Sequence, residues 1–330
     1  MKEHKKILFL STTDDGSTYY RMRLPHNKLK ELGYDVTHTL EFNGDIMAVN
    51  VDGKAVSLYE YDIVFMQTVA QARVLPMLSR LKKNHITIVL NIDDDYFNDN
   101  GTGSFYIPKA DKDTIRQAME YADNICVSTP ELAEVYGTDR CTFIDNYIDT
   151  SLYNSKKLEH DKFTIGWFGT VNHLWDLELI RGTVPDDVRF VIAGFPEALP
   201  KYFGNVKDTK AIGLFPITDL PSIISEIDLG LVPLVDNHFN RGKSDLKGVE
   251  FGAGHVPVIA SNVAPYKRWV ENGTNGYLAN NPKDFIKLIN RCINDTSLMD
   301  YLSINARNKA LLRDINIGIN KYIEKYNLVK

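Results

Sequence analysis

The stretch RGKSDLKGVEFGAGHVPVIAS, residues 241–261, concentrates positive charge where a helix is expected to begin. Arg241 and Lys243 precede this helix, and Lys247 and Glu250, three residues apart, share one of its faces. A helix N-terminus already favours anions through its free N–H groups and its dipole. These residue types suit a diphosphate beside the cations and a ribose diol on Glu250. A solvated basic loop with an i,i+3 ion pair fits the same spacing, and the spacing alone does not separate the two interpretations.

A second set of polar side chains lies in TTDDGSTYYRMR, residues 12–23, directly after the first expected strand. In a parallel α/β sheet such a loop lines the ligand crevice at the carboxyl ends of the strands. We therefore expect Asp14, Asp15, Tyr20 and Arg21 to bind hydroxyls or a phosphate of an acceptor, with Asp14 as a candidate base. A simple polar turn is the competing interpretation for each of them.

Three consecutive carboxylates, Asp93, Asp94 and Asp95, close the strand-like run ITIVLNID. Adjacent carboxylates repel one another, so the cluster requires compensation. One compensation is a divalent metal on Asp93 and Asp95, because Mg²⁺ and Mn²⁺ prefer oxygen ligands. The interpretation that we prefer needs no metal: Asp94 and Asp95 line the acceptor side of a cleft, and Asp94 is a catalytic candidate. A solvated turn remains open.

Short apolar runs alternate with helical patterns along the chain and form two groups. The predicted strands are 7–10, 61–67, 86–93, 124–128 and 142–146 in the first group, and 163–170, 189–195, 206–212, 228–234, 257–261 and 275–279 in the second. The predicted helices include 21–32, 74–84, 218–226 and 283–294. The first of these should end at Gly33 as a left-handed C-cap, and a further helix should begin with Thr129 as its N-cap and Pro130 in its first turn. Strands that alternate with helices form parallel sheets covered on both faces. The predicted fold class is α/β, with two doubly wound, Rossmann-like domains facing a cleft.

Boundaries follow from the same pattern. We predict a first, acceptor-binding domain at 1–150, a polar linker at 151–162, a second, nucleotide-sugar-binding domain at 163–312 and a final helix at 313–330. One face of that helix carries Ile315, Ile319, Tyr322 and Ile323. The helix before PVIAS is expected to have Ser244 as its N-cap and to end at Gly254.

The bulk properties exclude several classes of protein. The net charge is −5, so the chain as a whole has no electrostatic attraction to nucleic acid or an anionic membrane. Three cysteines without a CxxC pair argue against a zinc site or a disulfide framework and fit a reducing compartment. The first apolar run is too short for a signal peptide, and no run approaches the roughly 18 apolar residues of a membrane-spanning helix. We expect a cytoplasmic protein.

From about residue 120 onward the chain resembles the GT-B glycosyltransferases, specifically the large retaining group known as family 4 (glycosyl transferases group 1). The segment KSDLKGVEFGAGHVPVIASNVAPYKRWVENGTNGYLA carries a lysine, a glutamate, a small-residue turn, Pro-Val-Ile-Ala-Ser and a glycine turn at 272–276. FTIGWFGTVNH, VIAGF, DLGLVPL, VSTPELAEVYG and FIDNYID match in order and spacing, whereas the first third agrees only in layout.

The resemblance implies an enzyme that moves a sugar from a UDP- or GDP-sugar to an acceptor hydroxyl, with retention and without a metal. The residues at matching donor positions are Glu250 for the ribose, Arg241, Lys243 and Lys247 for the pyrophosphate, and Gly169 and Thr170 for the glycine turn. The cations Arg241 and Lys243 would stabilise the leaving diphosphate and so count as catalytic. The final helix is implied to pack back on the first domain.

Two departures leave the contacts to the donor sugar open. The family's second acid, eight residues before the helix glutamate, is replaced by Gly242. The basic residue that usually follows Gly-Thr is absent from VNHLWDLE at 171–178. Asp245 and His173 are the candidates to take over these contacts.

The acceptor is open between a glycan, a lipid-linked glycan and a hydroxymethylated base in DNA. DNA glucosyltransferases share the two-domain layout, and basic residues at 21–23 and 80–83 keep this alternative, whereas the acidic net charge disfavours a duplex. A non-catalytic sugar- or nucleotide-binding module and an epimerase of the same fold are further alternatives. The Asp-x-Asp spacing at 93–95 also fits the metal-dependent GT-A fold, but two α/β halves favour GT-B. The oligomeric state is not set by the sequence.

Overall fold

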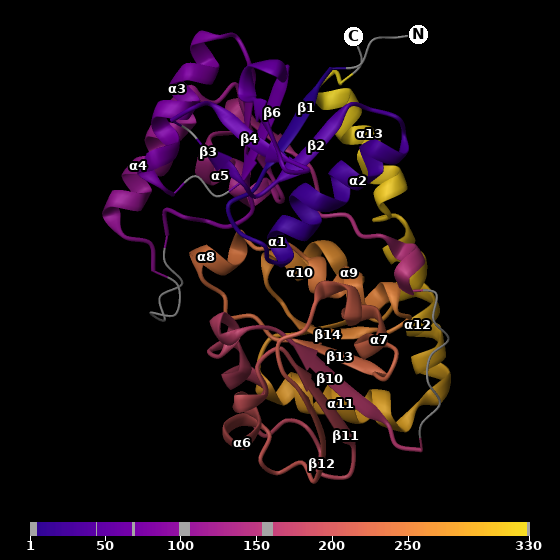
Figure 1. Ribbon diagram of the computed structural model, residues 1–330. Helices are drawn as coiled ribbons and strands as arrows, with labels where there is room; N and C mark the ends of the chain where they lie inside the picture. Colours follow the sequence, from indigo (N-terminus) through magenta and orange to yellow (C-terminus); the bar gives the residue numbers. More distant parts are fainter. Residues whose placement is uncertain (1–4, 44, 68–69, 99–105, 154–160, 329–330) are drawn as a thin grey trace.

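The computed structural model describes residues 5–43, 45–67, 70–98, 106–153 and 161–328. The two groups of strands form two separate parallel sheets, each packed between helices (Figure 1). Central strands such as Ile63–Gln67 and Thr164–Phe168 are buried along their whole length. Burial on both faces explains why they are continuous apolar runs without polar alternation. The predicted α/β fold class with two doubly wound sheets is confirmed.

The first sheet has the strand order β2-β1-β6-β7-β8-β9, with parallel pairings throughout. Its strands are β1 Ile7–Leu10, β2 Val36–Thr39, β6 Ile63–Gln67, β7 Thr87–Ile92, β8 Asn124–Val127 and β9 Cys141–Phe143. The order reverses between β1 and β6, since β2 lies on one side of β1 and the later strands lie on the other. Open α/β sheets bind ligands beyond the carboxyl ends of the strands at such a switch point.

The helices of the first domain are α1 Gly16–Thr18, η1 Tyr19–Arg23, α2 Leu24–Glu31, α3 Leu75–Lys83, α4 Lys109–Tyr121 and α5 Pro130–Tyr136. The first three form one continuous helical segment that begins at Gly16, earlier than the predicted Arg21. The Asp15 carboxylate caps it by accepting a hydrogen bond from the Thr18 N–H. η1 is a π-helical turn, a feature that concentrates at functional sites. Gly33 follows α2 with a φ of +83°, the left-handed C-cap predicted from the sequence.

A small antiparallel sheet lies beside the first sheet and was not predicted. Its strands are β3 Phe42–Asn43, β4 Ala48–Val51 and β5 Lys54–Ser57. Asp52 and Gly53 form the tight turn between β4 and β5, both with positive φ. The strands are short and most of their described side chains are only partly buried, so they lack a regular apolar pattern.

The second sheet has the strand order β12-β11-β10-β13-β14-β15, again parallel. Its strands are β10 Thr164–Phe168, β11 Arg189–Ala193, β12 Asp208–Ile212, β13 Leu229–Val232, β14 Val258–Ser261 and β15 Gly276–Ala279. This is the order of the dinucleotide-binding folds, with its switch point between β10 and β13. The carboxyl ends of these two strands are therefore where a ligand is expected.

The helices of the second domain are α6 Leu199–Tyr202, α7 Leu220–Ile224, α8 His238–Arg241, α9 Leu246–Ala253, α10 Ala264–Trp269, α11 Pro282–Asn294 and α12 Thr296–Leu311. Short 3₁₀ helices are η2 Leu58–Glu60, η3 Ala72–Val74, η4 Thr138–Arg140, η5 Thr150–Tyr153, η6 Val171–His173, η7 Asp176–Ile180, η8 Pro196–Ala198 and η9 Ile217–Asp219.

α9 ends at Gly254 as predicted, but its N-cap is Asp245. Ser244, the predicted cap, instead accepts a hydrogen bond from Asn146 Nδ2 at 3.0 Å.

The last helix, α13 Ile315–Lys325, leaves the second sheet and lies against α2 of the first (Figure 1). Its buried face carries Ile315, Ile319 and Tyr322, and Ile323 is partly buried. Tyr153, in the predicted polar linker, is buried, as are Tyr147 and Ile148 shortly before it. The physical reason is that Ile148 bonds through its backbone to both Arg313 and Ile315, which places this segment under α13. Residues 154–160 of the predicted linker lie outside the described residues.

Gly318 on α13 tests this packing, because a methyl group there would overlap the base of the Tyr147 ring. Gly318→Ala should lower the melting temperature, because overpacking reduces the free energy of unfolding by on the order of 1–3 kcal/mol. The preference of a helix interior for alanine over glycine, about 1 kcal/mol, offsets only part of this loss. The matched control is Gly213→Ala, whose added methyl group meets nothing within 4 Å. Thermal unfolding followed by circular dichroism measures both. An unchanged or raised melting temperature for Gly318→Ala would show that α13 is not held against Tyr147 in solution.

Candidate functional site

The loop after β10 lets a ligand come close to its backbone. The N–H of Gly169 donates to the Ala193 carbonyl at 3.0 Å, which holds the turn at the switch point. A Cβ on Gly169 would lie 2.7 Å from Trp167 Cζ2 and 3.1 Å from Lys247 Nζ, so a larger residue does not fit. Behind it, Gly194 has a φ of +92°, and a Cβ there would lie 2.5 Å from the Gly169 carbonyl oxygen. The turn, with Thr170 exposed after it, therefore leaves room for a ligand only at its outer side.

Lys247 lies in the first turn of α9, over this loop. Its ammonium is 5.7 Å from the centre of the Trp167 ring and 6.0 Å from that of Phe168. No described residue forms an ion pair or a hydrogen bond with it. Burial, with the nearby charge of Lys243 in the same direction, lowers the pKa of Lys247 to about 8. The site thus holds a partly buried cation that lacks an anionic partner.

Glu250 lies nearly one turn further along α9 and is 2% exposed. Its carboxylate accepts a hydrogen bond from the Tyr20 hydroxyl, which comes from η1 of the first domain. Burial raises the pKa of Glu250 to about 7, and the Tyr20 bond and Lys247 only partly oppose this. Tyr20, predicted to bind an acceptor, therefore reaches across to the donor side and satisfies the glutamate.

His173 belongs to the same site, at the end of η6. Its Nδ1 lies 2.8 Å from Asp176 Oδ2, and burial and the two nearby lysines lower its pKa to about 4. Because a carboxylate only accepts, Nδ1 carries the hydrogen and Nε2 is left as an acceptor. The other Asp176 oxygen accepts from Val235 N at 2.8 Å, after β13. Asp176 thus joins the loops after β10 and β13, and it holds the His173 ring across the switch point.

The two predicted phosphate ligands before α9 have different surroundings. Lys243 reaches into the cleft, where its ammonium lies 3.1 Å from Asp94 Oδ1 of the first domain. Arg241 is at the surface and forms an ion pair with Asp236, with N–O distances of 2.7 and 3.2 Å. Lys243 therefore joins the cluster with Lys247 and His173, whereas Arg241 is held by a partner on its own loop.

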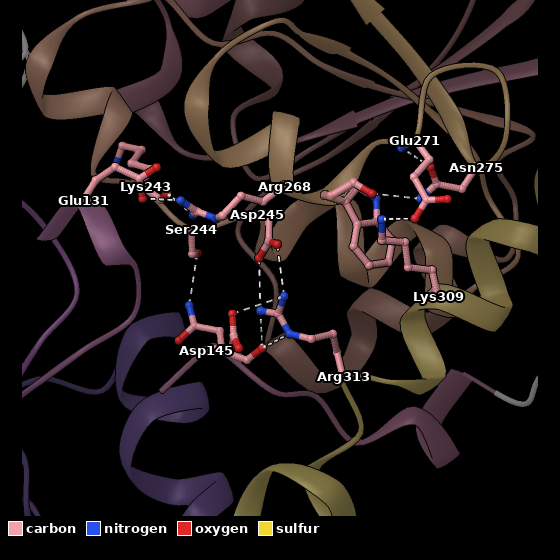
Figure 2. Close-up of polar contacts among 12 residues, drawn as sticks. Glu131, Asp145, Lys243, Ser244, Asp245, Arg268, Glu271, Asn275, Lys309 and Arg313 are labelled. Carbon is pink, nitrogen blue, oxygen red and sulfur yellow. Dashed lines mark hydrogen bonds and ion pairs between the residues drawn. The ribbon is translucent and has the colours of Figure 1, made fainter. Parts of the chain in front are cut away.

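Asp245, predicted as a donor contact, has a structural role. Its two oxygens each accept from the Arg313 guanidinium at 3.0 Å, as Figure 2 shows. Arg313 also donates to the Asn146 carbonyl at 2.7 and 3.1 Å. Next to it, Arg268 of α10 pairs with Glu131 of α5 (Figure 2). These contacts hold the start of α9 against the first domain, so Asp245, which is 4% exposed, positions the helix.

Three of the other acceptor candidates also have partners within the protein. Asp14 pairs with Arg23 at 2.5 Å on the surface, and Asp15 caps α1. Arg21 is buried, donating to Asn91 Oδ1 at 2.9 Å and to the Ile144 carbonyl at 2.6 Å. The structure therefore removes Arg21 from the acceptor surface, because its guanidinium fills the core beneath η1.

The acidic cluster is divided among different partners. Asp95 is 1% exposed and accepts from the N–H groups of Phe97 and Asn98 at 3.0 and 3.1 Å, which closes a turn. Asp94 pairs with Lys243, and Asp93 accepts from the Ser17 hydroxyl. Across the described ranges no three His, Cys, Asp or Glu side chains converge as a metal site would require. Repulsion within the cluster is relieved by hydrogen bonds and one lysine.

Sequence reasoning did not identify Asp176, Trp167 or the Tyr20–Glu250 contact. Asp176 lies in VNHLWDLE, three residues after His173, and this short spacing was the available signal. The Tyr20 contact joins residues that are 230 positions apart, so no local pattern encodes it.

Comparison with known proteins agrees with this geometry. Residues 165–295, which hold the loop after β10 and all of α9, match the family model described as glycosyl transferases group 1. The resemblance to this family that the sequence predicted is confirmed for the second domain. No curated protein matches the sequence.

Solved structures show the same fold over the whole chain. HepE from Anabaena, in complex with UDP-glucose, has 17% identity, a TM-score of 0.69 and coverage of 98% of this chain and 100% of that chain. Sucrose-phosphate synthase from Thermosynechococcus elongatus has 14% identity, a TM-score of 0.73 and coverage of 98% of each chain. The catalytic domain of starch synthase IV from Arabidopsis thaliana, bound to ADP and acarbose, has 11% identity, a TM-score of 0.71 and coverage of 98% of this chain and 99% of that chain. The predicted GT-B architecture is confirmed.

The raised pKa of Glu250 predicts a pH-dependent stability. The pKa is about 7 in the folded protein against 4.5 in its ordinary state, so the folded protein retains a proton that the unfolded chain has lost, and stability falls as the pH rises. Glu250→Gln has no carboxyl group at this position, so it removes this loss of stability at higher pH. Its free energy of unfolding relative to wild type should rise by on the order of 2 kcal/mol between about pH 5 and about pH 8.

Urea unfolding at both pH values measures this difference. The exposed Glu197→Gln is the matched control, and its difference from wild type should be the same at both pH values. A Glu250→Gln difference that is independent of pH, or that reverses, would mean that the Glu250 carboxylate is charged in the folded protein throughout this range.

Proposed function

We propose that this protein transfers a sugar from a nucleotide-diphosphate sugar to an acceptor hydroxyl, with retention and without a metal. One observation carries the proposal: the Lys247 ammonium lies over the glycine turn at the switch point of the second sheet, and no described residue pairs with it. An unpaired, partly buried cation is costly unless an anionic ligand compensates it. A diphosphate is such a ligand, and this end of a doubly wound sheet is where nucleotides bind.

The donor-binding roles follow from the geometry. Lys247 and Lys243 face the diphosphate, and the Gly169 turn allows the donor to approach the backbone. Glu250 accepts hydrogen bonds from the ribose diol in place of the Tyr20 hydroxyl. His173 Nε2 accepts a hydrogen bond from a hydroxyl of the donor sugar. A bound diphosphate raises the pKa of Lys247 back above its value of about 8 and so keeps it charged.

The transfer step uses the same residues. The acceptor oxygen forms a bond to C1 of the sugar while the bond from C1 to the diphosphate oxygen breaks. The electron pair of that bond stays on the diphosphate, which also takes the acceptor proton. Negative charge grows on the leaving group, and the Lys247 and Lys243 ammonium groups stabilise it more in the transition state than in the ground state. These two cations supply the counter-charge that a metal supplies in other transferases.

A UDP-sugar is our first choice of donor, because HepE, which shares the fold, is seen with UDP-glucose.

We place the protein in the cytoplasm, since its three cysteines are free of disulfides, as is usual in a reducing compartment. In the described part of the chain no helix has the length and apolar character needed to cross a membrane.

A thermal-shift panel of UDP-, GDP- and dTDP-sugars, with and without Mg²⁺ or Mn²⁺, tests the donor site. One sugar nucleotide should stabilise the wild type without metal, by about 2.7 kcal/mol at about 100 times its Kd. Lys247→Gln and Glu250→Ala should lose most of that shift. Glu197→Gln, on the surface, should keep it. No shift with any member of the panel would refute the proposed function, and a shift only with metal would refute metal independence.

Tyr20→Phe tests whether the tyrosine competes with the ribose for Glu250. Removal of the hydroxyl leaves the buried carboxylate without its hydrogen bond, so a bound ribose diol gains more. The affinity for the sugar nucleotide that the panel identifies should rise by about fivefold, as measured by isothermal titration calorimetry. Tyr19→Phe, the neighbouring residue on η1, should bind as the wild type does. Weaker binding by Tyr20→Phe would instead mean that the Tyr20 hydroxyl contacts the donor.

A further inference from the structure

The carboxyl edge of the first sheet holds a polar cluster that the donor site does not use. It consists of Ser17 in α1, Gln67 at the end of β6, and Asp93 directly after β7. The switch point of this sheet lies between β1 and β6, so the cluster lies at the end of the sheet where an open α/β sheet binds its ligand.

A chain of hydrogen bonds fixes the orientation of Asp93. Gln67 Nε2 donates to Ser17 Oγ at 2.7 Å, and Thr18 Oγ1 donates to Gln67 Oε1 at 2.9 Å. Because Ser17 accepts from the amide, its own hydrogen points to Asp93 Oδ2. The second oxygen of this carboxylate, Oδ1, receives no hydrogen bond from any described residue. Asp93 therefore presents one ordered and unoccupied acceptor.

Ser128 adds an independent observation. It is 3% exposed, and its hydroxyl oxygen has no hydrogen-bond partner within the described ranges, which is unusual for a buried polar group. Ile92 pairs with Val127, so Asp93 and Ser128 are the next residues on adjacent strands. They continue the face that carries Asn91 and Cys126, under the helical segment of Ser17. An unsatisfied hydroxyl thus follows β8 on the face of the sheet on which the Asp93 carboxylate follows β7.

The polar cluster adjoins the donor site on two sides. Asp94, next to Asp93, forms the ion pair with Lys243, and Tyr20, three residues after Ser17, bonds to Glu250. Thr129, next to Ser128, donates to the Gly242 carbonyl at 2.9 Å. The polar cluster therefore lies next to the junction of the two domains, where an acceptor must meet the donor sugar.

The charges at this edge of the sheet favour an uncharged acceptor. Four carboxylates follow β1 or β7 at this edge, those of Asp14, Asp15, Asp93 and Asp94. Arg23 pairs with Asp14 and Lys243 of the other domain pairs with Asp94, so the acidic groups outnumber these two cations. The pKa of Asp93 is raised to about 6, chiefly by burial and then by the charge of Asp94. A phosphate group placed here would be repelled, whereas uncharged hydroxyls can donate to the carboxylate.

We propose that Asp93 and Ser128 form the acceptor subsite and that they bind hydroxyl groups of an uncharged sugar or other polyol. The inference rests on the proposed transferase function and deepens it. Asp93 Oδ1 accepts from a hydroxyl next to the one that attacks the donor, and Ser128 Oγ bonds to a further hydroxyl of the acceptor. Both residues orient the acceptor, and the attacking hydroxyl keeps its own hydrogen for the leaving diphosphate.

The test measures release of the nucleotide diphosphate from the sugar nucleotide that stabilises the wild type. The probes are methyl α-glucoside, methyl β-glucoside and glycerol, compared with glucose 6-phosphate and with water alone. Neutral polyols should raise the release rate of the wild type above the rate in water, and glucose 6-phosphate should raise it less. Asp93→Asn should raise the KM for the effective polyol, or lower the polyol-dependent rate, by about tenfold or more.

Two readouts separate this inference from failure of the proposed function or of folding. Asp93→Asn should keep the wild-type thermal shift with the sugar nucleotide, because it lies outside the donor site. Ser128→Ala should raise the KM for the polyol while leaving the melting temperature unchanged or higher, because it removes an unsatisfied buried hydroxyl. The exposed Asp139→Asn, at the amino edge of the sheet, is the matched control and should behave as the wild type.

Loss of the donor shift in the wild type would refute the transferase itself. A normal donor shift together with an unaltered polyol response in Asp93→Asn would overturn the acceptor subsite alone. Stimulation by glucose 6-phosphate only, or by none of the neutral polyols, would overturn the assignment of an uncharged acceptor.

Discussion

The position of α9 depends on one ion pair, between Arg313 and Asp245. Both carboxylate oxygens of Asp245 accept from the guanidinium at 3.0 Å, and the same guanidinium holds the Asn146 carbonyl. The pair therefore joins the start of α9, the end of the first domain and the connection between α12 and α13 (Figure 2). Loss of one member of such a buried pair leaves the other charge uncompensated, which costs far more than a surface pair. Lys247 and Glu250 follow on α9, so their place at the switch point is set by residues that take no part in the chemistry.

The charges at the junction of the two domains are complementary. Lys243 and Lys247 come from the second domain, Asp93 and Asp94 from the edge of the first sheet, and Lys243 forms an ion pair with Asp94. Two carboxylates of the second domain lie at the same site, and each has a partner: Asp176 holds His173, and Glu250 accepts from the Tyr20 hydroxyl of the first domain. In the proposed function, a bound ribose diol takes the place of this hydroxyl, so the hydrogen bond to Glu250 is exchanged and not lost.

The sequence predicted the two sheets and the caps of several helices, because those features have local causes. Strands buried on both faces are continuous apolar runs, Thr129 before Pro130 is a helix start, and Gly33 is a left-handed C-cap. The placement of Glu250 and Lys247 could also be predicted from the sequence, because a helix N-terminus and an i,i+3 spacing are local patterns. The roles of Asp245 and Arg21 could not be predicted, because distant partners set them: Arg313 is 68 positions from Asp245, and Asn91 is 70 positions from Arg21. A polar side chain beside a ligand loop has the same sequence signal whether it faces a substrate or a buried counter-charge.

The glycine that replaces the family's second acid has a physical explanation in the contact between the domains. At Gly242 an added Cβ would lie 3.0 Å from Leu132 Cδ2 of α5, and the Gly242 carbonyl accepts from Thr129 at 2.9 Å. A carboxylate side chain at this position would therefore need Leu132 to move away. The glycine lets the first domain pack closely here. In the proposed function, the hydrogen bond that such an acid would accept from the donor sugar falls to another residue, and we assign it to His173 Nε2, which Asp176 orients across the switch point.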